Sequence, residues 1–129
     1  MINENVKKVL TDNLWYIATC GDEPNVVPVG FKGVTEDGKL TVGAVLLETT
    51  LNNIKANGKI AIAACDPTTL ESYQIKGTAE IVTEGPVFDT YVKIAEDTFK
   101  GAMPAKCALV ITPERVIVAS PSPDNKKEI

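Results

Sequence analysis

Two threonine side chains stand where a helix is predicted to begin, directly after an apolar, glycine-containing strand. The strand is expected from Leu40 to Leu47, and Thr49 and Thr50 follow it. The first turn of a helix leaves four backbone N–H groups without a partner and carries a partial positive charge. Two hydroxyl groups beside such a turn make it a favourable binding site for a phosphate. The plain alternative is that both threonines only cap the helix.

Other catalytic chemistry finds little support in the sequence. The chain contains no His, which removes the most common general base, the most common metal ligand and the Ser-His and Cys-His pairs. The odd count of three Cys offers no metal-ligand spacing, and Cys20, Cys65 and Cys107 all fall in apolar runs. We therefore expect them to be small buried side chains in a reducing compartment. A carboxylate pair such as Glu71 with Glu80 is a minor alternative for acid–base catalysis.

The composition predicts one folded domain without a nucleic-acid surface. The chain has 129 residues, of which 44% are hydrophobic and 23% charged, enough for a core. The net charge is −4, and Lys and Arg form no cluster of the kind that binds nucleic acid. No apolar run reaches the ~18 residues of a membrane span, and the N-terminal segment lacks the apolar region of a signal peptide. We therefore expect a cytoplasmic protein without a membrane segment.

The order of the elements predicts a mainly β fold. Strands follow one another through turns, whereas a doubly wound parallel sheet would alternate strands and helices throughout. Pro28 and Gly30 interrupt the second strand, which places it at an edge, at a bulge or beside a ligand. The run from Lys59 to Cys65 is almost wholly apolar, as in a central strand buried on both faces. The expected helices are 3–12, 50–57 and one that begins near Pro86, and the expected strands are 14–20, 25–34, 39–47, 59–65, 71–83, 107–111 and 115–119.

So many apolar strands in a short chain are best protected by an antiparallel sheet that curls into a barrel, because a barrel leaves few exposed edges. We expect this single domain to span residues 1–120. The remaining residues, 121–129, are polar and contain proline, which predicts a mobile C-terminal tail.

Short segments between Asn25 and Asp66 have a recognisable order and spacing. They are Pro-Asn-Val-Val-Pro-Val-Gly-Phe-Lys-Gly, a Glu-Asp-Gly-Lys turn, Leu-Thr-Val-Gly, Thr-Thr-Leu-Asn-Asn-Ile-Lys-Ala-Asn and Lys-Ile-Ala-Ile-Ala-Ala-Cys-Asp. This pattern resembles the core of the FMN-binding split barrels related to pyridoxamine 5′-phosphate oxidase. The segments 73–80 and 107–111 resemble later strands of the same family, and the similarity is closest to its small stand-alone FMN-binding proteins.

The resemblance implies a six- to seven-stranded antiparallel split β-barrel of Greek-key-like type, and a homodimer that binds FMN in a groove between its subunits. The protein would then be a flavin-dependent oxidoreductase. The FMN phosphate would meet the start of the short helix, and the ring would lie along the second and third strands. The implied cofactor contacts are Thr49, Thr50 and Asn53 at the phosphate, and Val27, Pro28, Val29, Gly30, Lys32, Gly43, Ala44 and Val45 on the ring side.

Two departures from the family pattern bear on function. Members often carry Arg or Lys at the helix start, where this chain has threonine, and Arg on the second strand, where it has Val27 or Pro28. Lys32 or Lys55 would then have to help hold the phosphate. The C-terminal Arg-x-His substrate clamp of the oxidases is also absent, so we do not expect oxidation of pyridoxamine phosphate itself.

Three hypotheses follow from these residues. The first is an FMN-dependent oxidoreductase, such as a flavin reductase. The second is a non-enzymatic flavin-binding or electron-transfer module. The third is a barrel of the same fold that binds another cofactor, such as a deazaflavin or haem, or a protein partner.

Overall fold

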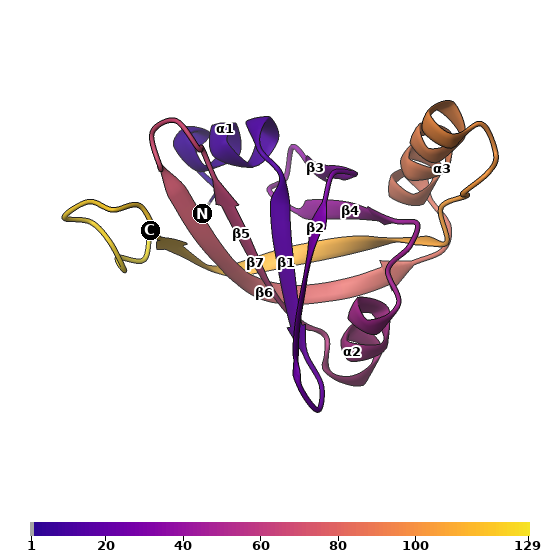
Figure 1. The fold of residues 1–129 in the computed structure, drawn as a ribbon, viewed down its shortest axis with the longest axis horizontal. Helices are drawn as coiled ribbons and strands as arrows, with labels where there is room; N and C mark the ends of the chain where they lie inside the picture. Colours follow the sequence, from indigo (N-terminus) through magenta and orange to yellow (C-terminus); the bar gives the residue numbers. More distant parts are fainter. Residues whose placement is uncertain (1) are drawn as a thin grey trace.

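The predicted strands pair into one strongly curved antiparallel sheet, which a computed structural model describes for residues 2–129 (Figure 1). The order of strands in the sheet is β2-β1-β5-β6-β7-β4-β3. This is the mainly β, antiparallel split barrel that the sequence predicted. The strands are β1 (Trp15–Cys20), β2 (Pro24–Val29), β3 (Lys32–Val34), β4 (Leu40–Ala44), β5 (Lys59–Cys65), β6 (Ser72–Val82) and β7 (Cys107–Val118), and the helices are α1 (Glu4–Asp12), α2 (Thr49–Asn57) and α3 (Pro86–Phe99).

Each helix carries the terminal signals expected from the sequence. The Asn3 side chain caps α1 by accepting a hydrogen bond of 3.0 Å from Val6 N. Helix α2 ends at Gly58, whose φ of 71° is the left-handed conformation that favours glycine. Helix α3 begins with Pro86, which needs no N–H partner there. Within residues 2–129, none of the helices has the length and apolar character required to span a membrane.

The predicted second strand, 25–34, is divided into β2 and β3 by a crossover at Gly30 and Phe31. The two parts are the opposite edges of the sheet, so this short segment crosses from one edge to the other. Its carbonyl at Phe31 accepts a hydrogen bond of 2.9 Å from Gly43 N, next to the β3–β4 ladder. Pro28 can pair at the edge because its missing N–H is not needed by a further strand.

The two predicted C-terminal strands form one long strand, β7. Residues 112–114 were expected to join two separate strands, and Pro113 among them cannot donate to a ladder. Instead the pairing of β6 with β7 shifts by one residue beside Gly77, which produces a bulge around Glu114. A Cβ atom on Gly77 would collide with the carbonyl oxygen of Thr112. The bulge therefore depends on glycine in the neighbouring strand, which the local sequence of β7 does not reveal.

Burial alternates along β5, so the prediction that this strand is buried on both faces is wrong for the single chain. Ile60, Ile62 and Ala64 point into the core, whereas Ala63 and Cys65 are exposed. The sheet has one layer here, and the chain covers only its inner face. The outer face of β5 is apolar as well. It therefore has the composition of a surface that contacts a partner molecule.

Two of the three cysteines differ from the expectation of burial. Cys20 and Cys65 are exposed, and only Cys107 is buried. An apolar run predicts a strand, but the side on which each residue projects depends on the register with its neighbours. Burial raises the pKa of the Cys107 thiol, an effect that Lys55 and Lys106 partly oppose.

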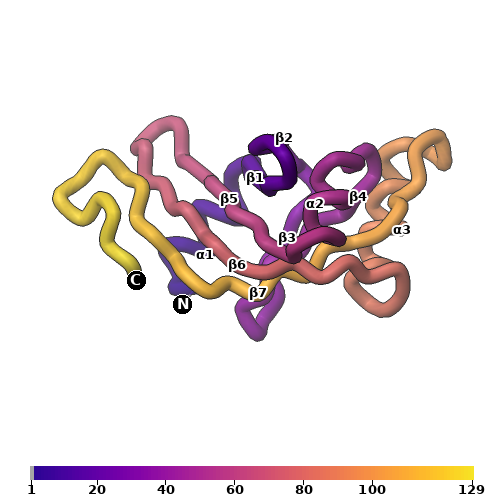
Figure 2. Tube along the Cα trace, turned by 90° about the horizontal axis from the view of Figure 1, so that it is seen from below, coloured from indigo at the N-terminus to yellow at the C-terminus, as the bar shows by residue number. Residues whose placement is uncertain are grey.

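The C-terminal tail, 121–129, is folded back on β7, contrary to the expectation of a mobile segment. Val118 N donates a hydrogen bond of 2.9 Å to Lys127 O, and Arg115 Nε donates one of 2.7 Å to Glu128. The tail thus pairs with the part of β7 that extends beyond β4. Figure 2 shows this turn at one end of the molecule and α3 at the opposite end.

Ionisation of Tyr73 is expected to destabilise the protein above pH 10. Tyr73 is 7% exposed, and its hydroxyl donates a hydrogen bond of 2.6 Å to Glu71. Burial and the neighbouring carboxylate raise the pKa of Tyr73 from 10.0 to about 12. Because the folded-state pKa lies above the unfolded one, this contribution is complete below pH 10 and is lost as the pH rises through about 12.

Urea unfolding between pH 8 and pH 12 measures this loss in Tyr73→Phe and in the wild type. Tyr73→Phe should flatten the alkaline decline of the unfolding free energy. An equal decline in Tyr73→Phe and the wild type would contradict the assignment.

Candidate functional site

An apolar groove of about 260 Å³ lies between the β2–β3 crossover, the end of β4 and the end of α3. None of its lining residues is charged. Five of the residues assigned to the ring side of a cofactor line it. The lining residues are Pro28, Val29, Gly30, Phe31, Gly43, Val45, Leu46, Leu47 and Phe99.

Three of the ring-side predictions lie outside the lining of this groove. Ala44 is buried in the core, and Val27 is half-buried against it. Lys32 projects from β3 toward α1, as described below. Alternation explains Ala44, because its neighbours Gly43 and Val45 line the groove and adjacent residues of a strand face opposite sides of the sheet. A continuous run of predicted contacts along a strand therefore contains residues that cannot all line one groove.

Phe99 was not predicted, and it forms one wall of the groove together with Phe31. Their ring centroids are 5.8 Å apart, with an angle of 46° between the ring planes. Phe99 is the last residue of α3. The helix reaches the groove because β4 pairs with β7 and α3 packs on both strands. No local pattern around Phe99 marks it, so only the tertiary arrangement identifies it.

Gly43 is required at its place because Tyr91 of α3 occupies the space of a side chain. A Cβ atom there would lie 2.5 Å from Tyr91 Cδ1. The Tyr91 hydroxyl lies 2.8 Å from Thr41 Oγ1, a buried hydrogen bond that joins α3 to β4. Burial raises the pKa of Tyr91, and the hydrogen bond to Thr41 lowers it in part. This contact joins α3 to β4, and Phe99 lies about two turns further along the same helix.

The start of α2 follows the groove closely in the sequence. Leu47 lines the groove, and the helix begins two residues later at Thr49. The N-cap residue is Glu48, and its side chain makes no capping hydrogen bond. The alternative that the two threonines simply cap the helix is therefore wrong. The side chain of Thr49 is exposed, whereas Thr50 is buried and accepts a hydrogen bond of 3.2 Å from Asn25 Nδ2.

Asn53 anchors α2 to the β1–β2 hairpin. Its Nδ2 donates a hydrogen bond of 3.0 Å to Thr19 Oγ1, and Asn57 Nδ2 donates one of 2.8 Å to Cys20 O. A side chain on Gly21 would collide with the Asn53 amide, so the hairpin approaches the helix closely. These contacts fix the position of α2 relative to β1 and β2.

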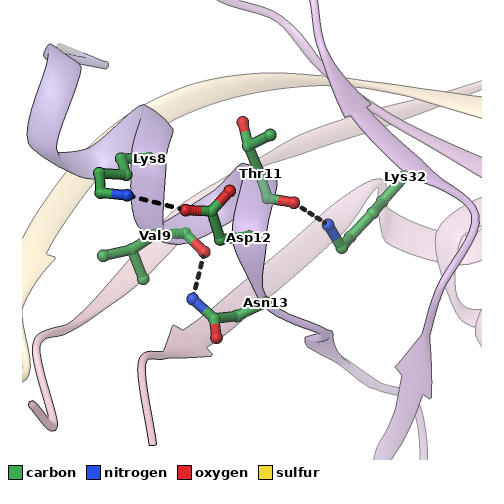
Figure 3. A network of polar contacts seen from close by, with 6 residues as sticks. All are labelled: Lys8, Val9, Thr11, Asp12, Asn13 and Lys32. Atoms are coloured by element: carbon green, nitrogen blue, oxygen red, sulfur yellow. Dashed lines mark hydrogen bonds and ion pairs between the residues drawn. The ribbon is translucent and has the colours of Figure 1, made fainter. Parts of the chain in front are cut away.

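The amine of Lys32 is bound at the C-terminal end of α1. It donates hydrogen bonds of 2.9 Å to Leu10 O and 3.1 Å to Thr11 O, the second of which Figure 3 shows. It also lies 5.5 Å from the centre of the Trp15 ring. Burial lowers the pKa of Lys32, and Asp12 partly opposes this effect.

The carboxylate pair considered for acid–base catalysis is not formed. Glu71 and Glu80 lie near opposite ends of β6, nine residues apart in the chain. An extended strand separates such residues by about 30 Å. Glu71 instead accepts the hydrogen bond from Tyr73.

The sequence matches one protein family over almost its whole length. Residues 2–119 match the family described as pyridoxamine 5′-phosphate oxidase. The chain belongs to this family. No curated protein matches the sequence. The match agrees with the split-barrel fold and with the resemblance found between Asn25 and Asp66.

Solved structures with the same fold include proteins of different kinds. HupZ of Group A Streptococcus is 30% identical, and the alignment covers 98% of this chain and 100% of that chain with a TM-score of 0.82. An FMN-binding protein from Syntrophomonas wolfei is 19% identical, with 88% and 83% covered and a TM-score of 0.70. An F420 reductase is 21% identical, with 88% and 97% covered and a TM-score of 0.67. The latter two support the fold.

Proposed function

We propose that this protein binds FMN and acts as a flavin-dependent oxidoreductase. The observation that carries the proposal is the apolar groove, because five of its nine lining residues are ones that the family resemblance assigned to the flavin ring, and because it ends beside the start of α2. The five residues are Pro28, Val29, Gly30, Gly43 and Val45.

The chemistry of the groove fits a flat aromatic ring. Its walls are aliphatic or aromatic, and the Phe31–Phe99 pair provides one side. When bound, FMN would supply transfer of a hydride or of single electrons. The residues of this chain would orient the ring and exclude water. None of the groove residues can exchange a proton, which favours reactions that need no acid or base from the protein.

The start of α2 suits the phosphate of FMN. The helix has nine residues, and the backbone N–H groups of its first turn lie beside the exposed Thr49 hydroxyl. Lys32 is bound to α1 and is left out of this proposed contact. Each missing charge-assisted hydrogen bond is worth roughly 1.5–3 kcal/mol. We therefore expect weaker FMN binding than in relatives that have Arg or Lys at this place.

A second copy of the chain would complete the site, in a homodimer. Pockets for small molecules usually measure roughly 300–1,000 Å³, and the groove of one chain, at about 260 Å³, is smaller. The outer face of the sheet offers the surface for such a contact. Tyr16 and Val26 are 51% and 62% exposed there, and they continue the exposed apolar side of β5.

The outer face has a charge pattern that is complementary to itself. One row across the strands is Val26, Ala18, Ala61, Lys76 and Arg115. A concave area, with a volume of about 630 Å³, extends along this row and is lined by Ala18, Ala61, Lys76 and Arg115. The β1–β2 turn, at the apolar end of the row, carries exposed acidic residues at 22 and 23, whereas Lys76 is exposed toward the other end, where Arg115 is paired with Glu128. A twofold axis would place each acidic turn near Lys76 of the partner subunit.

A non-enzymatic electron carrier is the second candidate function. The absence of charge among the groove residues favours it, because electron transfer needs no proton donor from the protein. An enzyme would differ by being reduced at a defined rate by a soluble donor such as a nicotinamide nucleotide.

One titration tests the proposal. Purified protein is mixed with FMN, and flavin fluorescence and the visible spectrum are followed, with riboflavin as a ligand that lacks the phosphate. We expect binding of both flavins, tighter for FMN, and a shift of the flavin bands. Protein that leaves both flavins unchanged would refute the proposal. Bleaching of the bound flavin by NADH or NADPH would then favour the enzyme over the carrier.

A further inference from the structure

We infer that Lys32 is a positioning residue for the flavin groove and does not bind the cofactor phosphate. The inference rests on the proposed FMN site. It starts from the place of Lys32 in the chain, immediately after Phe31, which lines the groove. The resemblance to the oxidases aligns this lysine with a basic residue that ends their second strand. The contacts of its side chain assign it a different task.

The C-terminal end of α1 is held by side chains from three directions. Asn13 Nδ2 donates a hydrogen bond of 3.0 Å to Val9 O, which Figure 3 shows, and Trp15 Nε1 donates one of 2.7 Å to Leu10 O. Lys32 adds its two hydrogen bonds to the same end. A cation is favoured there, because the last turn of a helix has unpaired carbonyl groups and a partial negative charge. The nearby Trp15 ring adds a cation–π contact.

The Lys32 amine lies far from the proposed phosphate site at the start of α2. The amine lies over Trp15 at the beginning of β1, whereas Thr50 is bonded to Asn25, which pairs with Thr19 near the other end of β1. Four residues of an extended strand span about 13 Å. Helices α1 and α2 accordingly lie at opposite ends of the half-barrel (Figure 1).

The lysine instead connects α1 to the crossover between β2 and β3. The crossover joins the two edges of the sheet, and a hydrogen bond from Gly43 N to Phe31 O holds it on the β4 side. Lys32 holds it on the side of α1. Because the segment from Pro28 to Phe31 is one wall of the groove, loss of this connection would loosen the wall that contacts the ring. The effect would fall on the ring and leave the phosphate contact unchanged.

The test compares FMN with riboflavin in the full-length protein. Lys32→Met should lower the affinity for both flavins by the same factor, about tenfold, because it removes hydrogen bonds from a charged donor. The ratio of the two affinities should stay at the wild-type value, and the bound-flavin absorption bands should shift. Lys7→Met is the matched control, because Lys7 is an exposed lysine of α1 that the proposed site does not use. It should leave riboflavin binding and the bound spectrum unchanged.

A selective loss of FMN binding in Lys32→Met, with riboflavin unaffected, would overturn the inference alone. A wild-type protein that binds neither flavin would overturn the proposed function and this inference with it. The wild type also allows a test that does not depend on the variant folding. The Lys32 side-chain ¹³Cε resonance should respond equally to FMN and riboflavin, and a response to FMN only would contradict the positioning role.

Discussion

Val45→Asp is expected to abolish flavin binding while the protein remains folded. Val45 is half-buried and lines the apolar groove, so a carboxylate there is hydrated as long as the groove is empty. A bound ring would remove that water, and the cost of desolvating an unpaired carboxylate is several kcal/mol. We expect the affinity for FMN and for riboflavin to fall at least about 100-fold, since each 1.4 kcal/mol is a factor of ten.

Val45→Thr is the matched control, because threonine has nearly the shape of valine and carries no charge. Its hydroxyl should reduce affinity by about tenfold at most. Fluorescence titration measures both variants, and urea unfolding checks that each has the stability of the wild type. Binding of either flavin by Val45→Asp within threefold of the wild type would show that the ring does not occupy this groove.

The elements with local signals were predictable from the sequence. Asn3 before α1, Gly58 after α2 and Pro86 at the start of α3 each act within one turn of the helix that they begin or end. The division of the second strand was also indicated by Pro28 and Gly30. These predictions depend on the conformational preferences of single residues. Such preferences are local, so they do not depend on the rest of the fold.

The features that were missed depend on partners distant in the sequence. Pro113 is accommodated in β7 because Gly77 of another strand permits a bulge. Phe99 reaches the groove only through the packing of α3 on β4 and β7. A lysine such as Lys32 has the same charge whether it faces a phosphate or a helix end, so its role follows from the direction of its side chain.

The apolar run of β5 shows a third kind of difference. The sequence pattern indicates two covered faces, and the chain covers one. The pattern is therefore informative about the assembly, because residues selected for burial by a partner have the same composition as residues buried in the core. This is the reason for placing the proposed dimer contact on the outer face of β1, β2 and β5.

Ala18→Glu is expected to produce a monomer that has also lost flavin binding. Ala18 lies between Val26 and Ala61 in the outer row, at the edge of the concave area. A glutamate there is hydrated in the monomer, but a partner subunit would bury its charge at a cost of several kcal/mol. We expect the dissociation constant of the dimer to rise at least about 100-fold. Sedimentation equilibrium and FMN titration of the same samples measure the two effects.

The two losses should occur together, because the groove of one chain is smaller than a usual ligand site and would be completed by the partner. Ala18→Gln has the length of glutamate without its charge, so it should remain more dimeric and retain more FMN. A dimer that persists in Ala18→Glu would place the subunit contact on another face. A monomer that binds FMN as tightly as the wild type would show that one chain holds the whole site, and the proposed role of the partner would then be wrong.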